Sequence, residues 1–228
     1  MECFMDFINL IFPKVCPACG ELLMKNESVI CAGCLYALPR TNFHLERDNP
    51  VAKTFWGRVR LENATSFYSY QAGSYLRRLI HELKYKGFKE IGEELGRQFG
   101  NELQATAFNE SELIIPVPLG KRKMKKRGFN QSECIARGLS LSMGKAVNTT
   151  AVIRTRNTRT QTKKSRYDRW LNVEDSFRVV DANALQEKHI LLVDDVVTTG
   201  ATIEACASEI LKVPGAKVSV ATLGVVLR

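Results

Sequence analysis

The segment from Ile190 to Thr202 constrains the fold of this chain more than any other stretch of its sequence. It opens with four apolar residues that favour a buried strand and continues directly into two carboxylates, Asp194 and Asp195. A short loop of small residues then leads through Gly200 into a helix. Open α/β sheets bind ligands beyond the carboxyl ends of their parallel strands. This order of residues therefore predicts a parallel sheet with a ligand site at its edge.

The loop after the carboxylates favours a phosphate group. Backbone N–H groups converge at the start of a helix, where the partial positive charge attracts an anion. Hydroxyl donors are available from Thr198, Thr199 and Thr202. Because carboxylates would repel that phosphate, we expect them to meet a different group, such as a sugar diol with or without a hard cation like Mg²⁺. The alternative for an Asp-Asp pair alone is a plain strand-to-helix turn with an N-cap.

Hydrophobic periodicity elsewhere predicts alternating strands and helices, and hence a mainly parallel α/β sheet covered by helices on both faces. The expected strands are 64–70, 113–115, 151–153, 190–193 and 218–226, and the expected helices begin near 76, 91, 130 and 200. Asn130 is the expected N-cap of the third helix, with Glu133 completing a capping box, and Gly144 its expected end. Positions 155–172 show no core periodicity.

Four cysteines near the amino terminus have the spacing of a metal site. Cys16 and Cys19 form one Cys-x-x-Cys pair, and Cys31 and Cys34 form a second, eleven residues later. Two such pairs supply the tetrahedral four-thiolate set that suits a structural Zn²⁺. Dithiol redox chemistry is the rival interpretation, but no thioredoxin-like unit surrounds either pair.

The positive charge of the chain is concentrated in one segment. The net charge is +9, yet the stretch from Lys121 to Arg169 alone holds 15 Lys or Arg against two acidic residues. Such a field indicates an anionic partner, either a phosphate-rich small molecule or nucleic acid. A solvated basic face without a partner is the remaining alternative. Phe129, Tyr167 and Trp170 lie among these charges and offer faces on which bases could stack.

We expect two domains, an N-terminal helix with a zinc-ribbon-like module at 1–45 and a larger domain at 46–228. The first dozen residues carry Glu2 and Asp6 where a secretory signal would carry Lys or Arg, and are too short to span a bilayer. They are predicted to form a short amphipathic helix that packs on the rest of the protein, with a membrane-surface anchor as the alternative. Since no other run reaches transmembrane length, a cytoplasmic protein with reduced cysteines is expected.

Position by position, Ile190 to Thr202 resembles the 5-phosphoribosyl-1-pyrophosphate signature of type I phosphoribosyltransferases. That resemblance implies that Asp194 and Asp195 bind the ribose hydroxyls and act as the catalytic pair. It implies that the 5-phosphate binds the loop formed by Val197, Thr198, Thr199, Gly200, Ala201 and Thr202. The turn Pro116-Val117-Pro118 leads into Lys121, and in these enzymes the corresponding loop meets the pyrophosphate and its Mg²⁺. A surface basic loop is the alternative for Lys121.

Over almost its whole length the chain resembles the bacterial ComF family. The resemblance rests on the four-cysteine pattern, Leu83–Gly87, Pro116–Pro118, Arg127–Gln131 and Val193–Asp195, in that order. A further hood pattern is carried by Thr158, Gln161, Arg166 and Asn172. It implies a type I phosphoribosyltransferase fold and a link to natural competence, in which single-stranded DNA crosses the inner membrane.

Two classes of function follow from the resemblance. One is a protein that binds phosphoribosyl pyrophosphate with Mg²⁺ and handles single-stranded DNA alongside competence DNA-uptake proteins. The other is an active phosphoribosyltransferase that displaces pyrophosphate with a small nucleophile and has no DNA role. The sequence names no acceptor, so both stay open.

Overall fold

The computed structural model describes residues 13–155 and 176–227, and its centre is a sheet of five parallel strands. The strand order is β1-β7-β6-β2-β3, so β6 lies in the middle. The bounds are β1 Ala64–Ser69, β2 Leu113–Pro116, β3 Ala146–Val147, β6 His189–Val197 and β7 Lys217–Val225. This confirms the expected α/β class with a mainly parallel sheet.

The helices expected near positions 76, 91, 130 and 200 are present, whereas the helix expected in the first dozen residues lies outside the described residues. The α-helices are α2 Ala32–Tyr36, α3 Pro50–Lys53, α4 Tyr75–Tyr85, α5 Lys89–Leu103, α6 Lys121–Arg127, α7 Gln131–Met143 and α9 Ala201–Ile210. Two short 3₁₀ turns, η1 Phe43–Leu45 and η2 Ala107–Glu110, complete the set in the described residues. Asn130 caps α7 as expected, whereas Glu133 binds Arg137 one turn later. Gly144 ends α7 in a left-handed conformation.

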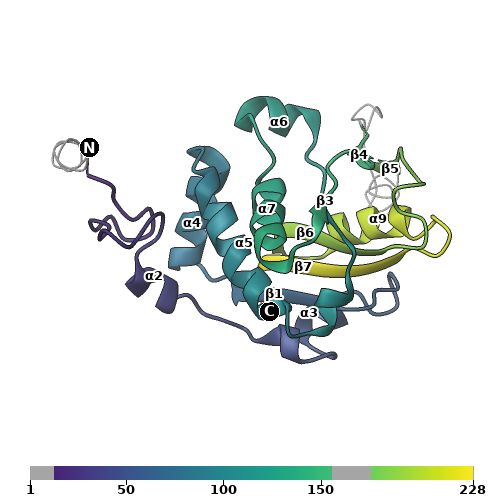
Figure 1. The fold of residues 1–228 in the computed structure, drawn as a ribbon, viewed down its shortest axis with the longest axis horizontal. Helices are drawn as coiled ribbons and strands as arrows, with labels where there is room; N and C mark the ends of the chain where they lie inside the picture. Colours follow the sequence, from purple (N-terminus) through teal and green to yellow (C-terminus); the bar gives the residue numbers. More distant parts are fainter. Residues whose placement is uncertain (1–12, 156–175, 228) are drawn as a thin grey trace, which may run out of the picture.

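Helices cover both faces of the sheet (Figure 1). Apolar side chains of α4, α5 and α7 pack on one face in a core that includes Leu191 and Val193 of β6. On the other face, α9 and the segment around α3 pack against Ile190 and Leu192. Successive residues of a strand point to opposite faces, which is why a run of four apolar residues fits this central position.

Glycines bring α5 and α7 into close contact. Gly92, Gly96 and Gly100 recur every fourth residue on α5, and Gly138 of α7 faces them. A Cβ at Gly92 would lie 2.8 Å from Cys134 Cβ, and one at Gly138 would lie 2.7 Å from Arg97 N. The backbones therefore approach more closely than side chains would allow. This crossing fixes the amino end of α7 above the sheet.

Two local expectations were wrong, and one expected strand is present but lies in a separate sheet. The basic loop after β2 is instead the helix α6, because seven consecutive residues without Gly or Pro favour a helix up to Gly128. The strand near 151–153 is β4 Val152–Arg154, which lies outside the central sheet and pairs antiparallel with β5 Phe177–Val179. The central strand does not stop before the carboxylates, because Asp194 and the residues up to Val197 continue to pair with β7. Within the described residues, no helix is long and apolar enough to span a membrane.

Candidate ligand site at the carboxyl edge of the sheet

The strand order changes direction between β2 and β6, because the strand that follows each of them in sequence is added on opposite sides of the sheet. From β2 the chain passes through α7 to β3 on one side, and from β6 through α9 to β7 on the other. Because α7 and α9 cover opposite faces, the carboxyl ends of β2 and β6 form the switch point at which open α/β sheets bind their ligands. β2 ends at Pro116, opposite Val193, so the next residue of β6 lies beyond it. That residue is Asp194, which places the predicted carboxylates at the switch point.

Asp194 is partly buried at this switch point. Ser132, at the start of α7, donates a hydrogen bond from Oγ to Asp194 Oδ1 at 2.8 Å, and the backbone N–H of Asp195 donates to the same oxygen at 2.9 Å. Burial, and then the negative charge of the adjacent Asp195, raise the pKa of Asp194 to about 7. The carboxyl therefore exchanges its proton near neutral pH, where a cation or a hydrogen-bonding ligand would favour the charged form.

Asp195 has different neighbours, because adjacent residues of a strand face opposite ways. It is only 5% exposed, and its Oδ2 lies 2.5 Å from Nζ of Lys84, in the last turn of α4. Its Oδ1 accepts a hydrogen bond from Val196 N at 2.7 Å. The two carboxylates are thus brought together as predicted, but Lys84 already neutralises one of them. Sequence reasoning gave Lys84 no role, although it lies in the Leu83–Gly87 motif.

The predicted phosphate loop forms a small hollow at the start of α9. The hollow measures about 50 Å³ and is lined by Asp194 and residues 196–203. Val197 ends β6, Thr198 and Thr199 are exposed, and α9 begins at Ala201. Gly200 has φ +75°, a conformation that side chains disfavour. The hollow therefore joins Asp194 to the N–H groups at the helix start in one site.

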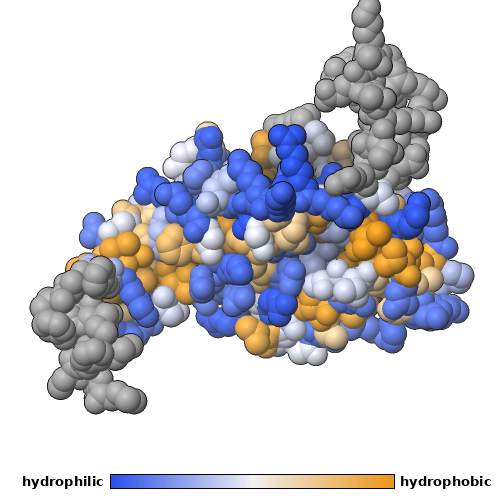
Figure 2. Space-filling view, turned by 90° about the horizontal axis from the view of Figure 1, so that it is seen from above, coloured by the Kyte–Doolittle hydropathy of each residue, from blue (hydrophilic) through white to orange (hydrophobic). Residues whose placement is uncertain are grey.

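The basic helix α6 lines a second hollow at the same edge. It measures about 590 Å³ and is lined by Gly120, Lys121, Arg122, Lys123, Lys125, Arg154 and Thr155. Lys121 lies here, outside the hollow of the phosphate loop. Figure 2, seen from the α6 side, shows hydrophilic residues gathered across the middle of this face. Contact of Lys121 with a diphosphate thus stays a prediction.

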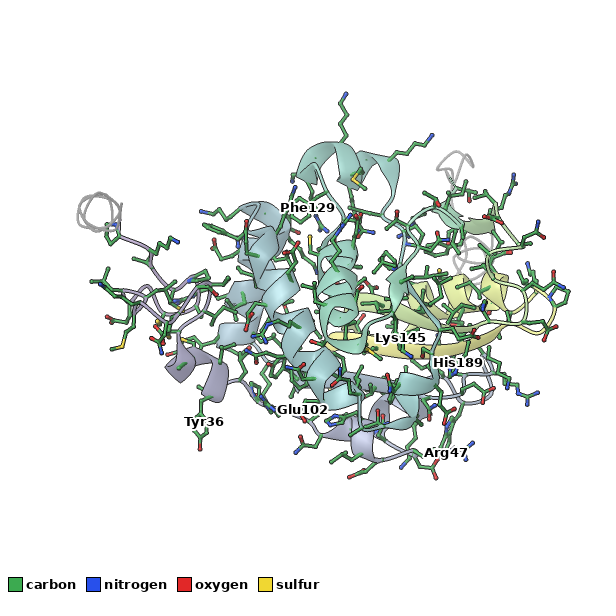
Figure 3. The ribbon with its side chains drawn as sticks, viewed as in Figure 1. Tyr36, Arg47, Glu102, Phe129, Lys145 and His189 are labelled. Atoms are coloured by element: carbon green, nitrogen blue, oxygen red, sulfur yellow. The ribbon has the colours of Figure 1, made fainter. Side chains whose placement is uncertain are left out.

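Aromatic rings lie among these cations. The guanidinium of Arg127 lies 5.3 Å from the ring centroid of Tyr85, and Nζ of Lys89 lies 5.2 Å from that of Phe129. Figure 3 places Phe129 between α6 and α7. Tyr85 is 55% exposed, and its ring also lies near Nζ of Lys126, 5.9 Å from the ring centroid. The other predicted stacking residues, Tyr167 and Trp170, lie outside the described residues, as do the hood residues Thr158, Gln161, Arg166 and Asn172.

The four cysteines of the amino-terminal module form one cluster. The Sγ atoms of Cys16, Cys19, Cys31 and Cys34 all lie within 4.8 Å of one another, and none of the four is in a disulfide. Cys19 Sγ is 3.8 Å from Cys31 Sγ. Tetrahedral Zn²⁺ with Zn–S bonds of about 2.3 Å requires sulfurs about 3.8 Å apart, so the cluster fits this ion.

Local backbone geometry favours the thiolate of Cys16, whereas burial and the neighbouring thiols raise the pKa of Cys34. Burial acts to raise the pKa of Cys16, but backbone N–H groups of Cys31, Cys19 and Ala18 outweigh it and lower the pKa to about 7. Thiolate is the form that binds metal. The segment that carries the cysteines also contacts α4, since Arg78 of α4 donates to the Ala18 carbonyl at 2.5 Å.

The chain shares its sequence with curated bacterial proteins. It is 31% identical over 210 residues to the DNA utilization protein YhgH of Escherichia coli K12, which covers 90% of this chain and 88% of YhgH. It is 30% identical over 203 residues to the competence protein ComFC of Bacillus subtilis, covering 87% and 78% of the two chains. Competence protein F of Haemophilus influenzae is 37% identical over 93 residues, covering 40% and 41%.

No family model matches the chain. Among solved structures, a glutamine phosphoribosylpyrophosphate amidotransferase of B. subtilis complexed with ADP and GMP aligns with a TM-score of 0.43 and 18% identity, over 62% of this chain and 30% of that one. The similarity to YhgH and ComFC extends along most of all three chains, and the chain therefore belongs to the ComF family.

Proposed function

We propose that this chain binds 5-phosphoribosyl-1-pyrophosphate with Mg²⁺ at the carboxyl edge of β6. The 5-phosphate occupies the loop from Val197 to Thr202, and the ribose hydroxyls meet Asp194 and Asp195. The observation that carries the proposal is that Asp194 and the loop line one hollow. A sugar phosphate is a ligand whose hydroxyls suit the carboxylate and whose phosphate suits the helix start. Carboxylate oxygens also fit Mg²⁺, a hard cation that prefers oxygen ligands.

The same site can support group transfer. An acceptor would form a bond to C1 of the ribose as the bond from C1 to the pyrophosphate oxygen breaks, and the electron pair would leave with pyrophosphate. The cations of α6 are suited to stabilise that leaving charge, with Lys121 and Arg154 lining the basic hollow. Mg²⁺ would add charge neutralisation at the diphosphate when bound. The acceptor is unnamed, so binding is the primary proposal and transfer is the alternative.

Ligand-dependent thermal stability tests the binding proposal. Phosphoribosyl pyrophosphate with Mg²⁺, at about 100 times its Kd, should stabilise the wild type by about 2.7 kcal/mol. Asp194→Asn combined with Asp195→Asn should remain folded and lose this shift. Asp48→Asn, at an exposed carboxylate in another part of the chain, is the control and should keep it. An equal shift in the double variant would exclude the assignment.

We also propose that the chain takes part in DNA uptake and binds single-stranded DNA with its basic segment. The names of its relatives, a competence protein and a DNA utilization protein, support this role. The described part of that segment adds a physical reason, because the cations of α6 lie beside the exposed ring of Tyr85. A nucleic-acid strand needs both phosphate neutralisation and a stacking face.

Salt dependence separates this role from a small-molecule enzyme. Each phosphate contacted should contribute about 0.7 to the slope of log affinity against log salt. Changing Lys123, Lys125 and Lys126 to Gln should weaken binding and flatten that slope. The matched control changes Lys188, Lys212 and Lys217 to Gln at the amino edge of the sheet, and should alter neither. If the α6 variant binds like the wild type, the small-molecule reaction without a DNA role becomes the better account.

We further propose that the cysteine cluster holds one structural Zn²⁺ and that residues 1–45 form a separate module around it. Four thiolates leave no open position for a substrate, which favours a structural role. Ile30 and Leu38 are buried in the same core as α4 and α5, so the metal would also support the contact with the larger domain.

A further inference from the structure

The phosphate loop rests on a segment far away in the sequence. This support, residues 49–58, begins at Asn49, which is 1% exposed. Asn49 Oδ1 accepts from Val51 N and Ala52 N, at 2.9 and 3.0 Å, and so caps α3. Its Nδ2 donates to the carbonyls of Glu46 and Ala64, both at 2.8 Å. The support is therefore anchored to β1 and has a defined position under the loop.

Two residues of the support fill the space behind Gly200. A Cβ on Gly200 would lie 2.8 Å from Phe55 Cε1 and 3.1 Å from Thr54 Cγ2. Phe55 is almost fully buried. The loop is thus pressed against a fixed wall, and both its positive φ and this close approach require glycine here.

Arg58 joins the support to both sides of Gly200. Its Nη1 donates to the Thr199 carbonyl at 2.8 Å and to the Thr54 carbonyl at 2.9 Å. Its Nη2 binds the carboxylate of Glu204, in the first turn of α9. One planar guanidinium therefore fixes the residue before Gly200 and the helix after it. Only arginine offers donors in this forked arrangement.

These contacts have two consequences for an anion in the hollow. The oxygen of the Thr199 carbonyl accepts a hydrogen bond from Arg58, which partly neutralises its negative charge near a bound anion. The Glu204 carboxylate, which would repel a phosphate at the start of α9, is neutralised. We propose that Arg58 is a positioning residue that holds the phosphate loop in its anion-binding conformation. This inference rests on the proposed function.

The test measures the affinity of the full chain for phosphoribosyl pyrophosphate with Mg²⁺. Arg58→Ala should weaken binding about ten- to a hundredfold, the loss typical of hydrogen bonds to charged groups. Arg58→Lys should weaken it by less, since an ammonium restores the charge but not the fork. Arg60→Ala is the matched control, because Arg60 is exposed and lines a neighbouring groove. This variant should bind the ligand with the affinity of the wild type.

Chemical rescue separates positioning from general stability. Millimolar guanidinium should restore much of the affinity of Arg58→Ala and should not affect the wild type, while ammonium at equal ionic strength should not. Wild-type affinity in Arg58→Ala, or weak affinity with no rescue, overturns the inference. If Arg58→Ala does not fold, Arg58→Lys decides, and an affinity equal to wild type again overturns it. Failure of the wild type itself to bind would instead contradict the proposed function.

Discussion

Lys84 and Asp195 form an ion pair, and the removal of one partner alone should lower the stability of the fold more than the removal of both. The Nζ–Oδ2 distance is 2.5 Å, and the side chains are 21% and 8% exposed. Lys84→Met removes the ammonium but keeps a chain of similar length. Because the carboxylate of Asp195 would stay buried without its cation, we expect a loss of about 3–5 kcal/mol in the free energy of unfolding.

The magnitude follows from two opposing terms. At an effective dielectric constant near 20, unit charges 2.5 Å apart attract by about 7 kcal/mol. Desolvating two ions costs several kcal/mol each, so the intact pair contributes little net stability compared with an uncharged pair. Combining Lys84→Met with Asp195→Asn should therefore recover most of the loss. The coupling between the two changes should exceed the about 0.5 kcal/mol expected for independent sites.

Urea unfolding of the four proteins in this double-mutant cycle measures the coupling. Lys188→Met is a matched control, because Lys188 Nζ lies 2.7 Å from Glu112 Oε2 but both side chains are nearly half exposed. Solvent screens that pair, so the control should unfold at almost the wild-type urea concentration. Additive losses in the Lys84 and Asp195 variants, or an unchanged midpoint for Lys84→Met, would refute the argument.

Three further predictions concern metal, packing and pH. Elemental analysis should find one zinc per chain, and Cys16→Ser should lose it and expose the amino-terminal module to protease; wild-type protein without zinc would contradict this. Gly138→Ala should destabilise the chain by about 1–3 kcal/mol through overpacking against α5. Gly33→Ala places its methyl group in open space and should leave the stability unchanged, and thermal unfolding of the two variants measures the difference. The pKa of Asp194 is raised from 3.8 to about 7, so protonation of this carboxyl stabilises the folded state at low pH. That contribution is lost as the pH rises from 3.8 to about 7. The stability of the wild type relative to Asp194→Asn should therefore fall over this range.

The parallel sheet and the position of its site could be predicted from the sequence because both depend on local order. Four apolar residues followed by two carboxylates favour a buried central strand whose polar carboxyl end lies at the edge of the sheet. The cysteine cluster was equally predictable, since two short Cys-x-x-Cys turns carry all four ligands. α6 was mistaken for a loop because a run of cations has no apolar face to mark a helix.

The residues that hold the site could not be found by the same reasoning. Ser132 binds Asp194 across 62 positions, and Arg58 binds Thr199 across 141. No spacing rule connects such partners, because they meet only after the sheet has formed. Arg58 in particular lies in a turn with no periodicity. Lys84 had a signal in its motif, but its partner became evident only when α4 was placed beside β6.

The sizes of the two hollows bear on which ligand the edge accepts. The hollow at the phosphate loop, about 50 Å³, can hold little more than one phosphate group, whereas the hollow beside α6 is about 590 Å³ and basic. Both follow the carboxyl ends of neighbouring strands, β6 and β2. A ligand with a single phosphate at one end and a more highly charged group at the other matches this difference, and phosphoribosyl pyrophosphate has that form. A single DNA strand carries identical phosphates along its length, so it would match the broad basic hollow and leave the small one to a sugar phosphate. The two ligands would therefore share the basic hollow, and single-stranded DNA should compete with the diphosphate end of phosphoribosyl pyrophosphate for it.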